Sequence, residues 1–222
     1  MSKRVLVLVE GQTEERFVKD ILGPAYLNRE IYFCPTILVT KRVKYGPNFK
    51  GGVTNFAKFS NDVQRLLKSK SSDLVTTMID YYALPIDFPG MNTRPNASPL
   101  EKVQHVEDAI AAHFKHPSNF LPFLILHEFE AWLFSSLEEL PMVMTARDKK
   151  DQFSAIRGKL TPEDIDEGPE TAPSKRILKL FPAYRKTLHG PTVAKRIGLE
   201  RIRTECPHLA SWLSNLEAII AH

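Results

Sequence analysis

Residues 4–22 read RVLVLVEGQTEERFVKDIL, and this stretch decides the fold class. Its first six residues form an apolar run with three valines that ends at Glu10-Gly11, which is typical of a strand buried on both faces. Thr13 then stands at a helix start, and apolar residues follow at helical spacing as far as Leu22. The stretch therefore predicts a strand, a tight turn and a helix, in that order.

The same alternation continues toward the middle of the chain. The apolar patterns predict further strands at 31–39, 73–80 and 120–126 and further helices at 55–68, 99–114 and 127–136. Residues 81–99 are dense in Pro, Gly and Asn, which indicates a long loop. Strands that alternate with helices and read as continuous apolar runs favour a parallel sheet covered on both faces.

The strand patterns stop after about residue 140. From there the sequence predicts short helices at 174–181, 191–197, 199–205 and 208–220. The last of these is amphipathic, and we expect its apolar face to pack on the rest of the domain, with an oligomer interface as the alternative. We therefore expect an α/β body followed by a helical C-terminal extension.

Length and composition fit an ordinary globular chain. The 222 residues are 43% hydrophobic and 25% charged, which excludes fibrous and disordered proteins. Cys34 and Cys206 lack the spacing of a zinc site, and two isolated cysteines are typical of a reducing, cytoplasmic environment. The apolar runs are too short to cross a membrane, so we expect no membrane association.

The net charge of +4 conceals an uneven distribution. Residues 39–70 contain eight Lys or Arg and one acid, and residues 171–206 contain nine Lys or Arg and two acids. Residues 73–140 are the reverse, with ten acids and three basic residues. An acidic centre between basic segments suits an anionic polymer held across a cation, although charge runs are usually only solvated surfaces.

Three of the predicted strands end at or near a carboxylate: Glu10, Asp80 and Glu128. The carboxyl ends of parallel strands meet at one edge of a sheet, so we expect these side chains to converge there. Several carboxylates in a partly dry cleft repel one another, and a hard divalent cation offsets that repulsion. The pattern predicts Mg²⁺ or Mn²⁺ rather than zinc.

Each acid also has a purely structural explanation. Glu14 would favour a helix start through the helix dipole, and Asp80 could cap a turn into the next segment. Glu128 and Glu130 are two residues apart and cannot share a helix face, so we expect only one of them to point at the site. His127, which directly precedes Glu128, is more typical of a structural histidine than of a metal ligand.

Five blocks in order, VEGQTEERF, MIDYYALPIDFPG, ILHEFEAWLFS, TAPSKRI and RIRTECPHLASWL, carry a resemblance to a known family. The first block resembles the opening motif of the Toprim superfamily, which includes topoisomerases, primases and overcoming-lysogenization-defect nucleases. Together the blocks resemble a stand-alone Toprim-like domain of unknown function, family 4276. Members of this family are associated with bacterial mobile and defence gene clusters.

The resemblance implies a Rossmann-like Toprim fold over residues 1–140, with the helical extension at 141–222 packed on it as one unit. It also implies metal-dependent phosphodiester chemistry. By position Glu10 matches the motif glutamate, Asp80 the first acid of an Asp-x-Asp pair, and Glu128 or Glu130 a later acidic position. Tyr82 stands where the second aspartate belongs, so a ligand is missing unless Asp87 replaces it.

The remaining roles follow from phosphodiester chemistry. Glu10 or Glu14 is placed to act as a general base or metal ligand, and Lys175 or Arg176 at a helix start could hold the scissile phosphate. We expect contacts to a nucleic-acid backbone from three basic side chains beside a Gly-rich loop: Lys41, Arg42 and Lys44.

The leading hypothesis is a nuclease that acts on DNA in anti-phage defence or a mobile element. The resemblance alone implies its partner, an ATPase of the AAA or ABC type. One alternative is a non-catalytic subunit that binds nucleic acid or protein, and another is phosphoryl or nucleotidyl transfer on RNA or a nucleotide. The sequence leaves the oligomeric state open.

Overall fold

The structure is a computed structural model that describes residues 2–41, 49–50, 53–165, 168 and 170–221. Its centre is a parallel sheet with the strand order β2-β1-β5-β6, in which β7 also pairs with β5. The strands are β1 (Lys3–Val9), β2 (Ile31–Ile37), β5 (Leu74–Asp80), β6 (Phe120–Leu121) and β7 (Leu124–Ile125). The predicted α/β fold with a parallel sheet is confirmed.

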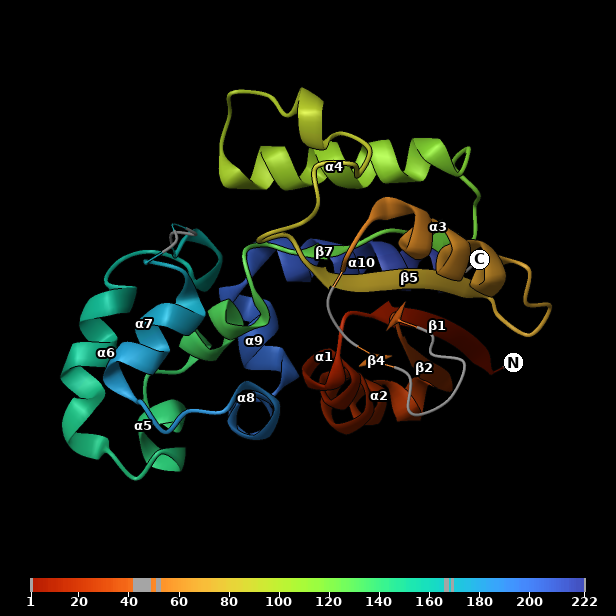
Figure 1. The fold of residues 1–222 in the computed structure, drawn as a ribbon. Helices are drawn as coiled ribbons and strands as arrows, with labels where there is room; N and C mark the ends of the chain where they lie inside the picture. Colours follow the sequence, from red (N-terminus) through yellow and green to blue (C-terminus); the bar gives the residue numbers. More distant parts are fainter. Residues whose placement is uncertain (1, 42–48, 51–52, 166–167, 169, 222) are drawn as a thin grey trace.

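The helices cover both faces of this sheet (Figure 1). On the first face lies a continuous helical run made of α1 (Gln12–Phe17), a π-helical turn (Val18–Leu22) and α2 (Gly23–Tyr26). A short 3₁₀ turn, Leu27–Arg29, then leads into β2. The opposite face is covered by α3 (Phe56–Leu67) and α4 (Pro99–His113), with the 3₁₀ turn Met91–Thr93 in the loop between β5 and α4.

In its described part, the segment after β7 contains helices joined by turns and loops and no strand. It comprises the 3₁₀ helix η4 (Phe129–Ser135), α5 (Glu139–Val143), α6 (Lys150–Arg157), α7 (Pro173–Leu180), α8 (Lys186–Ile197), α9 (Leu199–Glu205) and α10 (Pro207–Ala221), with 3₁₀ turns at Arg147–Lys149 and Pro162–Asp164. In Figure 1, α5 to α8 lie beyond the carboxyl ends of β1 and β5, whereas α10 runs along the sheet. This arrangement places α5 to α8 opposite the sheet edge at which the predicted acids lie (Figure 1).

Two buried cores lie on either side of the sheet because successive strand residues point to opposite faces. Val5, Val7 and Val9 of β1 share one core with the helices that follow residue 128, including α10. Leu6 and Leu8 share the other core with α3 and α4. Burial on both faces explains why β1 reads as a continuous apolar run rather than as an alternating one.

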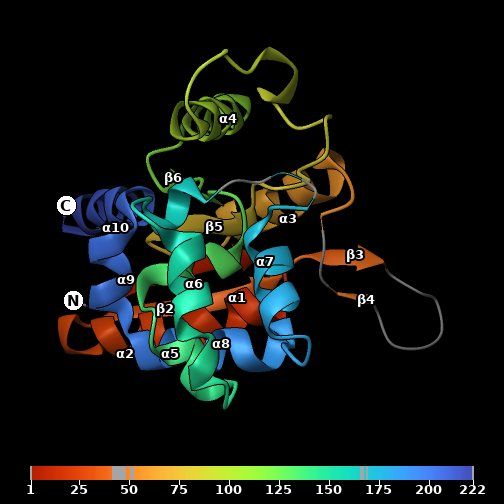
Figure 2. The ribbon, with the colours of Figure 1, turned by 90° about the vertical axis from the view of Figure 1, so that its left-hand side faces the viewer.

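A small antiparallel pair, β3 (Val39–Lys41) and β4 (Phe49–Lys50), lies apart from the main sheet. Figure 2 shows it projecting from the body of the molecule. Among the described residues, none of the helices has both the length and the apolarity that a membrane crossing needs.

Several predicted boundaries are wrong for identifiable reasons. The expected strand at 120–126 consists of two short strands, because Pro122 lacks the N–H that a ladder requires. The expected strand at 31–39 ends at Ile37, and the expected helix at 127–136 is the 3₁₀ helix η4. Helices α5 and α6 are not in the prediction.

Helix α8 begins five residues before the predicted start at 191, because Pro191 is tolerated inside it. A proline within a helix leaves the carbonyl four residues earlier without its helical donor. That carbonyl belongs to Thr187, and the Arg16 side chain of α1 donates to it at 3.1 Å. A contact from a distant helix thus compensates for the bond that Pro191 cannot make.

Candidate functional site

The acids predicted at the strand ends meet at the carboxyl edge of the sheet. Glu10 directly follows β1, and its Oε2 accepts a hydrogen bond from the backbone N–H of Asp80 at 3.0 Å. Asp80 is the last residue of β5, and its Oδ1 accepts from the backbone N–H of Phe129 at 3.0 Å. These two bonds connect β1, β5 and the start of η4, so the fold itself fixes the positions of both carboxylates.

Lys186, the first residue of α8, extends into this cluster. Its Nζ lies 3.1 Å from Asp80 Oδ2 and 3.1 Å from Glu130 Oε2. The other oxygen of Glu130, Oε1, accepts from the Tyr184 hydroxyl at 3.2 Å. The side chain of Glu130 is completely buried, and a buried carboxylate requires a cation and hydrogen-bond donors of this kind.

Glu14 adds a further carboxylate from the first turn of α1. Its Oε2 accepts a hydrogen bond from the backbone N–H of Gly11 at 2.9 Å, which is a capping interaction at the helix start. The residue is only 3% exposed. Glu14 therefore does stabilise the start of α1, as its structural explanation predicts. The same hydrogen bond also orients its carboxylate within the cluster.

Burial and mutual repulsion shift the proton affinities of these acids. Burial raises the pKa of Glu10 to about 8, and the charges of Asp80 and Glu14 add to the rise. Burial likewise raises the pKa of Glu14 to about 7 and that of Glu130 to about 7, although Lys186 opposes both shifts. The charge of one lysine is therefore not enough to bring the pKa values of these acids back to their usual range.

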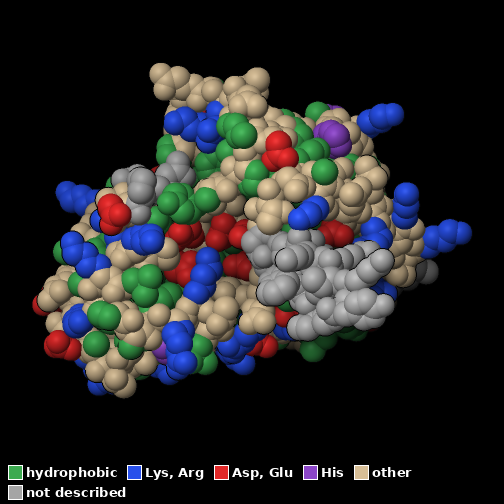
Figure 3. All heavy atoms as spheres, in the orientation of Figure 1, with side chains coloured by type: hydrophobic (Ala, Val, Ile, Leu, Met, Phe, Trp, Pro, Cys, Tyr) green, Lys and Arg blue, Asp and Glu red, His purple; other side chains and the backbone are tan. Residues whose placement is uncertain are grey.

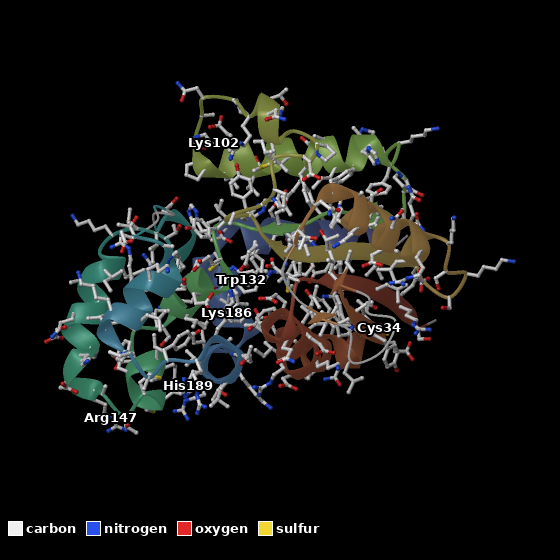
Figure 4. The ribbon with its side chains drawn as sticks, viewed as in Figure 1. Cys34, Lys102, Trp132, Arg147, Lys186 and His189 are labelled. Carbon is white, nitrogen blue, oxygen red and sulfur yellow. The ribbon has the colours of Figure 1, made fainter. Side chains whose placement is uncertain are left out.

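Electrostatics also keep the lysine charged. Burial alone would lower the pKa of Lys186, but the negative charges of Asp80, Glu130 and Glu14 raise it above its usual range. The Lys186 side chain is nevertheless 41% exposed, so part of it faces solvent while its ammonium contacts Asp80 and Glu130. Figure 4 shows Lys186 in the region between the sheet and α5 to α8.

The backbone next to the acids has an uncommon conformation. His127 has a φ of +67°, in the left-handed region that non-glycine residues rarely adopt. Its carbonyl accepts from the backbone N–H of Tyr82 at 2.8 Å. Such conformations cluster at functional sites, and this one redirects the chain between β7 and η4 so that Glu128 and Glu130 follow at the sheet edge.

Glu128 and Glu130 take different partners. Both oxygens of Glu128 bind Ser174, one from the backbone N–H at 2.9 Å and one from the hydroxyl at 3.0 Å. Ser174 lies in the first turn of α7, so Glu128 satisfies the start of that helix. Only Glu130 reaches Lys186.

The predicted phosphate site at the start of α7 is therefore wrong in part. The expected free N–H groups are not all available, because that of Ser174 is bound to Glu128. The Arg176 side chain donates to the Thr171 carbonyl within its own segment. Lys175 is exposed at this helix start, where it is accessible to an anionic ligand.

The suggested replacement ligand Asp87 lies elsewhere. Its carboxylate accepts from the backbone N–H of Phe56 at 2.9 Å, at the start of α3. This bond ties one carboxylate oxygen of Asp87 to the start of α3, so it gives no support to the hypothesis that Asp87 takes the place of the second aspartate. Tyr82 is half-buried beside the site.

The basic residues proposed for backbone contacts are only partly described. Lys41 ends β3 on the projecting pair of strands. Arg42 and Lys44 lie outside the described residues.

Three residues of the site were not predicted: Ser174, Tyr184 and Lys186. The acids were recognisable because each follows an apolar strand, whereas Lys186 is one of nine basic residues in a segment without strands. Its local sequence carries no signal that separates it from its neighbours. Only the packing of α8 against α1, η4 and α5 brings it to the acids.

A hard divalent cation can be tested against this donor set. The acids supply only oxygen ligands, which Mg²⁺ and Mn²⁺ prefer. Among the described residues, however, no three His, Cys, Asp or Glu side chains are arranged so that they could hold one ion. The chemistry of the donors thus suits the metal, and the Lys186 ammonium, 3.1 Å from both Asp80 and Glu130, lies where a cation shared by these two acids would lie.

The surface near the cluster carries charges of both signs (Figure 3). Figure 3 shows acidic side chains gathered in a hollow near the middle of one face, with basic side chains beside and around them. A hollow of this charge pattern suits an anionic polymer that contacts a cation at its centre.

Comparison with known proteins identifies the family. The profile described as Domain of unknown function (DUF4276) matches residues 9–217, which include every acid of the cluster and Lys186. Searches of the curated proteins and of the solved structures each give no significant match. The chain therefore belongs to the DUF4276 family, as the sequence blocks predicted.

Proposed function

We propose that this protein is a metal-dependent nuclease that hydrolyses phosphodiester bonds, with DNA as the favoured substrate. The observation that carries the proposal is the convergence of Glu10, Asp80 and Glu130 at one edge of a parallel sheet. Burial, together with the charges of neighbouring acids, raises the pKa of Glu10 and of Glu130 despite the nearby lysine, so a further cation would stabilise their ionised forms. Buried acids without such a function would be replaced at little cost by apolar residues.

The chain's own residues would position a metal and a water molecule. Glu10, Asp80 and Glu130 would hold Mg²⁺ or Mn²⁺ once the Lys186 ammonium leaves Asp80 and Glu130, and the metal would supply Lewis acidity toward a phosphate oxygen. The backbone N–H groups of Asp80 and Phe129 already orient the first two carboxylates. This orientation lowers the entropic cost of assembling the site.

Glu14 is the best candidate for a proton acceptor. The Gly11 N–H fixes one of its oxygens. Its pKa of about 7 balances proton affinity against availability at neutral pH, which is the condition for an efficient general base. Lys175, exposed at the start of α7, is proposed to contact a substrate phosphate.

The finer assignments rest on the sequence resemblance. We propose that the domain belongs to the Toprim superfamily and acts in the cytoplasm in anti-phage defence or a mobile element. An ATPase of the AAA or ABC type is the proposed partner. The basic segments at 39–70 and 171–206 support the nucleic-acid substrate through their charge.

The test is cleavage by the purified protein. Plasmid, single-stranded DNA and RNA are incubated with Mg²⁺ or Mn²⁺, with and without a chelator, alone and with the ATPase partner. We expect metal-dependent cutting that falls by a factor of at least about 100 in Glu10→Gln and Asp80→Asn. Glu15→Gln is the matched control, because Glu15 lies next to Glu14 but pairs with Lys19 at 2.7 Å.

Two results would contradict the proposal. Absence of metal-dependent cutting by the wild type, with or without its partner, rules out the nuclease. Activity that survives both Glu10→Gln and Asp80→Asn shows that the site is elsewhere.

A second candidate is a non-catalytic subunit that binds nucleic acid. The ion pairs of Lys186 favour it, because a lysine already neutralises two of the acids, and Tyr82 stands where a second aspartate is expected. This candidate predicts DNA binding without cleavage, and binding that is unchanged by a chelator.

A further inference from the structure

Lys186 contacts the oxygen of Asp80 and of Glu130 that does not accept the Phe129 or Tyr184 hydrogen bond. In Asp80 the Phe129 N–H occupies Oδ1, and in Glu130 the Tyr184 hydroxyl occupies Oε1. The Lys186 ammonium lies 3.1 Å from the remaining oxygen of each acid, Oδ2 and Oε2. The lysine thus holds the cation position of the cluster.

A divalent cation and this ammonium cannot share those oxygens. Mg²⁺ binds a carboxylate oxygen at about 2.1 Å and tolerates little distortion of its geometry. With Nζ at 3.1 Å from the same oxygen, the two cations would lie no more than about 5 Å apart in a partly dry site. Their repulsion makes the two occupants exclusive.

The Lys186 side chain can move out of the cluster. Its side chain is 41% exposed, and its four-carbon stem can rotate the ammonium into solvent while α8 stays in place. Glu130, in contrast, is completely buried and cannot be left without a cation. An exchange of one cation for the other would therefore leave the buried charge compensated both before and after metal binding.

We propose that Lys186 is an internal counter-ion that competes with the divalent metal for Asp80 and Glu130, so that metal binding releases Lys186 from the cluster. This inference rests on the proposed function, because it assumes that these acids bind a metal. It adds a limit on the metal affinity that is set by the protein itself.

The test is Mn²⁺ binding, measured by isothermal titration calorimetry in 0.5 M salt, where long-range charge effects are screened. We expect Lys186→Met to bind Mn²⁺ at least about tenfold more tightly than the wild type, because the metal no longer displaces an ion pair. Lys186→Arg keeps the charge and is expected to bind no more tightly than the wild type. Lys195→Met is the matched control, since it removes the same charge from an exposed position of the same helix.

The possible outcomes distinguish a failure of the competition from a failure of the metal site. Saturable Mn²⁺ binding that is equal or weaker in Lys186→Met overturns the competition and leaves the metal site of the proposed function intact. A gain of the same size in Lys195→Met also overturns it, since net charge would then be the cause. No binding by the wild type or any variant overturns both the competition and the metal site.

Stability gives a second measurement. Lys186→Met leaves two buried acids without their cation, so we expect a lower melting temperature without metal and a larger rise on adding Mn²⁺ than in the wild type. If this variant is unfolded without metal, recovery of its far-UV circular dichroism on titration with Mn²⁺ gives the same answer. A rise no larger than that of the wild type contradicts the proposal.

Discussion

At the scale of single residues, the molecule contains two kinds of charged cluster with different physical roles. At the sheet edge several acids share one lysine, and burial raises the pKa of Glu10 and Glu130. At the other cluster one acid, Glu217, is held by Arg29 at 2.8 Å, by Arg203 at 2.9 Å and by the Tyr26 hydroxyl. The first arrangement favours binding a further cation, whereas the second favours stability.

The Glu217 cluster predicts how stability depends on pH. Burial opposes ionisation, but hydrogen bonds from Arg203, Tyr26 and Arg29 outweigh it and lower the pKa of Glu217 to about 2. The ionised form therefore stabilises the fold fully above pH 4.5, the unshifted value, and this contribution is lost as the pH falls toward about 2. We expect Glu217→Gln to lower the free energy of unfolding by about 1–2 kcal/mol at pH 7.

Urea denaturation of the wild type and Glu217→Gln at several pH values from 7 to 3 checks this expectation. The difference between the two proteins should shrink as the pH falls below 4.5. A difference that stays constant would show that packing rather than charge is responsible. Glu200→Gln, at an exposed position, should change the free energy by less than about 0.5 kcal/mol at every pH.

At the scale of elements, two close contacts hold segments together that are distant in sequence: one joins α1 to α8, and the other joins the loop after β5 to α4. The Arg16 side chain of α1 binds the Thr187 carbonyl of α8, which holds the lysine-bearing helix next to the acid-bearing one. On the other face, Gly90 brings the long loop after β5 against α4. Its φ is +84°, and a Cβ there would lie 2.9 Å from Ala109 Cβ and 3.1 Å from Val106 Cα. Only glycine fits both the conformation and the space.

This contact predicts a coupling between Gly90 and Ala109. We expect Gly90→Ala to lower the free energy of unfolding by about 2–4 kcal/mol, through backbone strain and overpacking. Ala109→Gly alone should cost about 1 kcal/mol through helix propensity. Because the double variant removes the nearest steric contact, it should lose about 1 kcal/mol less than the sum of the single variants, as measured by urea denaturation. Strict additivity would show that this contact is not the cause.

At the scale of the whole molecule, the helices after residue 140 share a core with the sheet. Leu209, Leu213 and Leu216 of α10 belong to the same buried cluster as Val5 and Val7 of β1. The Trp212 indole N–H also donates to Thr76 Oγ1 in β5, at 3.0 Å. These contacts favour one cooperative unit over two independent domains.

Cooperativity can be measured with a core variant in α10. We expect Leu213→Ala to lower the free energy of unfolding by about 2–4 kcal/mol and to destabilise the sheet and the C-terminal helices together, in one transition. Circular dichroism reports the helices, and hydrogen exchange at β1 reports the sheet. Two separate transitions, or a β1 that keeps its protection, would contradict a single unit. Ser211→Ala, on the exposed side of α10, should leave both measurements nearly unchanged.

Local sequence patterns were enough to predict the parallel sheet, the family and the acids at the strand ends. Glu10 and Asp80 were predictable because each ends an apolar strand, and the geometry of parallel strands then requires the two carboxylates to meet. Local patterns failed where distant contacts override them, as at Pro191, whose helix is completed by Arg16. They also give no sign that the Asp87 carboxylate accepts a hydrogen bond at the start of α3.

The cation that compensates the buried acids could be found only once the chain was folded. Lys186 is 106 residues from Asp80 in sequence, and nothing in its neighbourhood marks it among the other basic residues. Its role depends on a packing of α8 that combines many weak contacts, none of which has a local signature. A carboxylate at a strand end is a property of local sequence, whereas the cation that neutralises it is a property of the assembled fold.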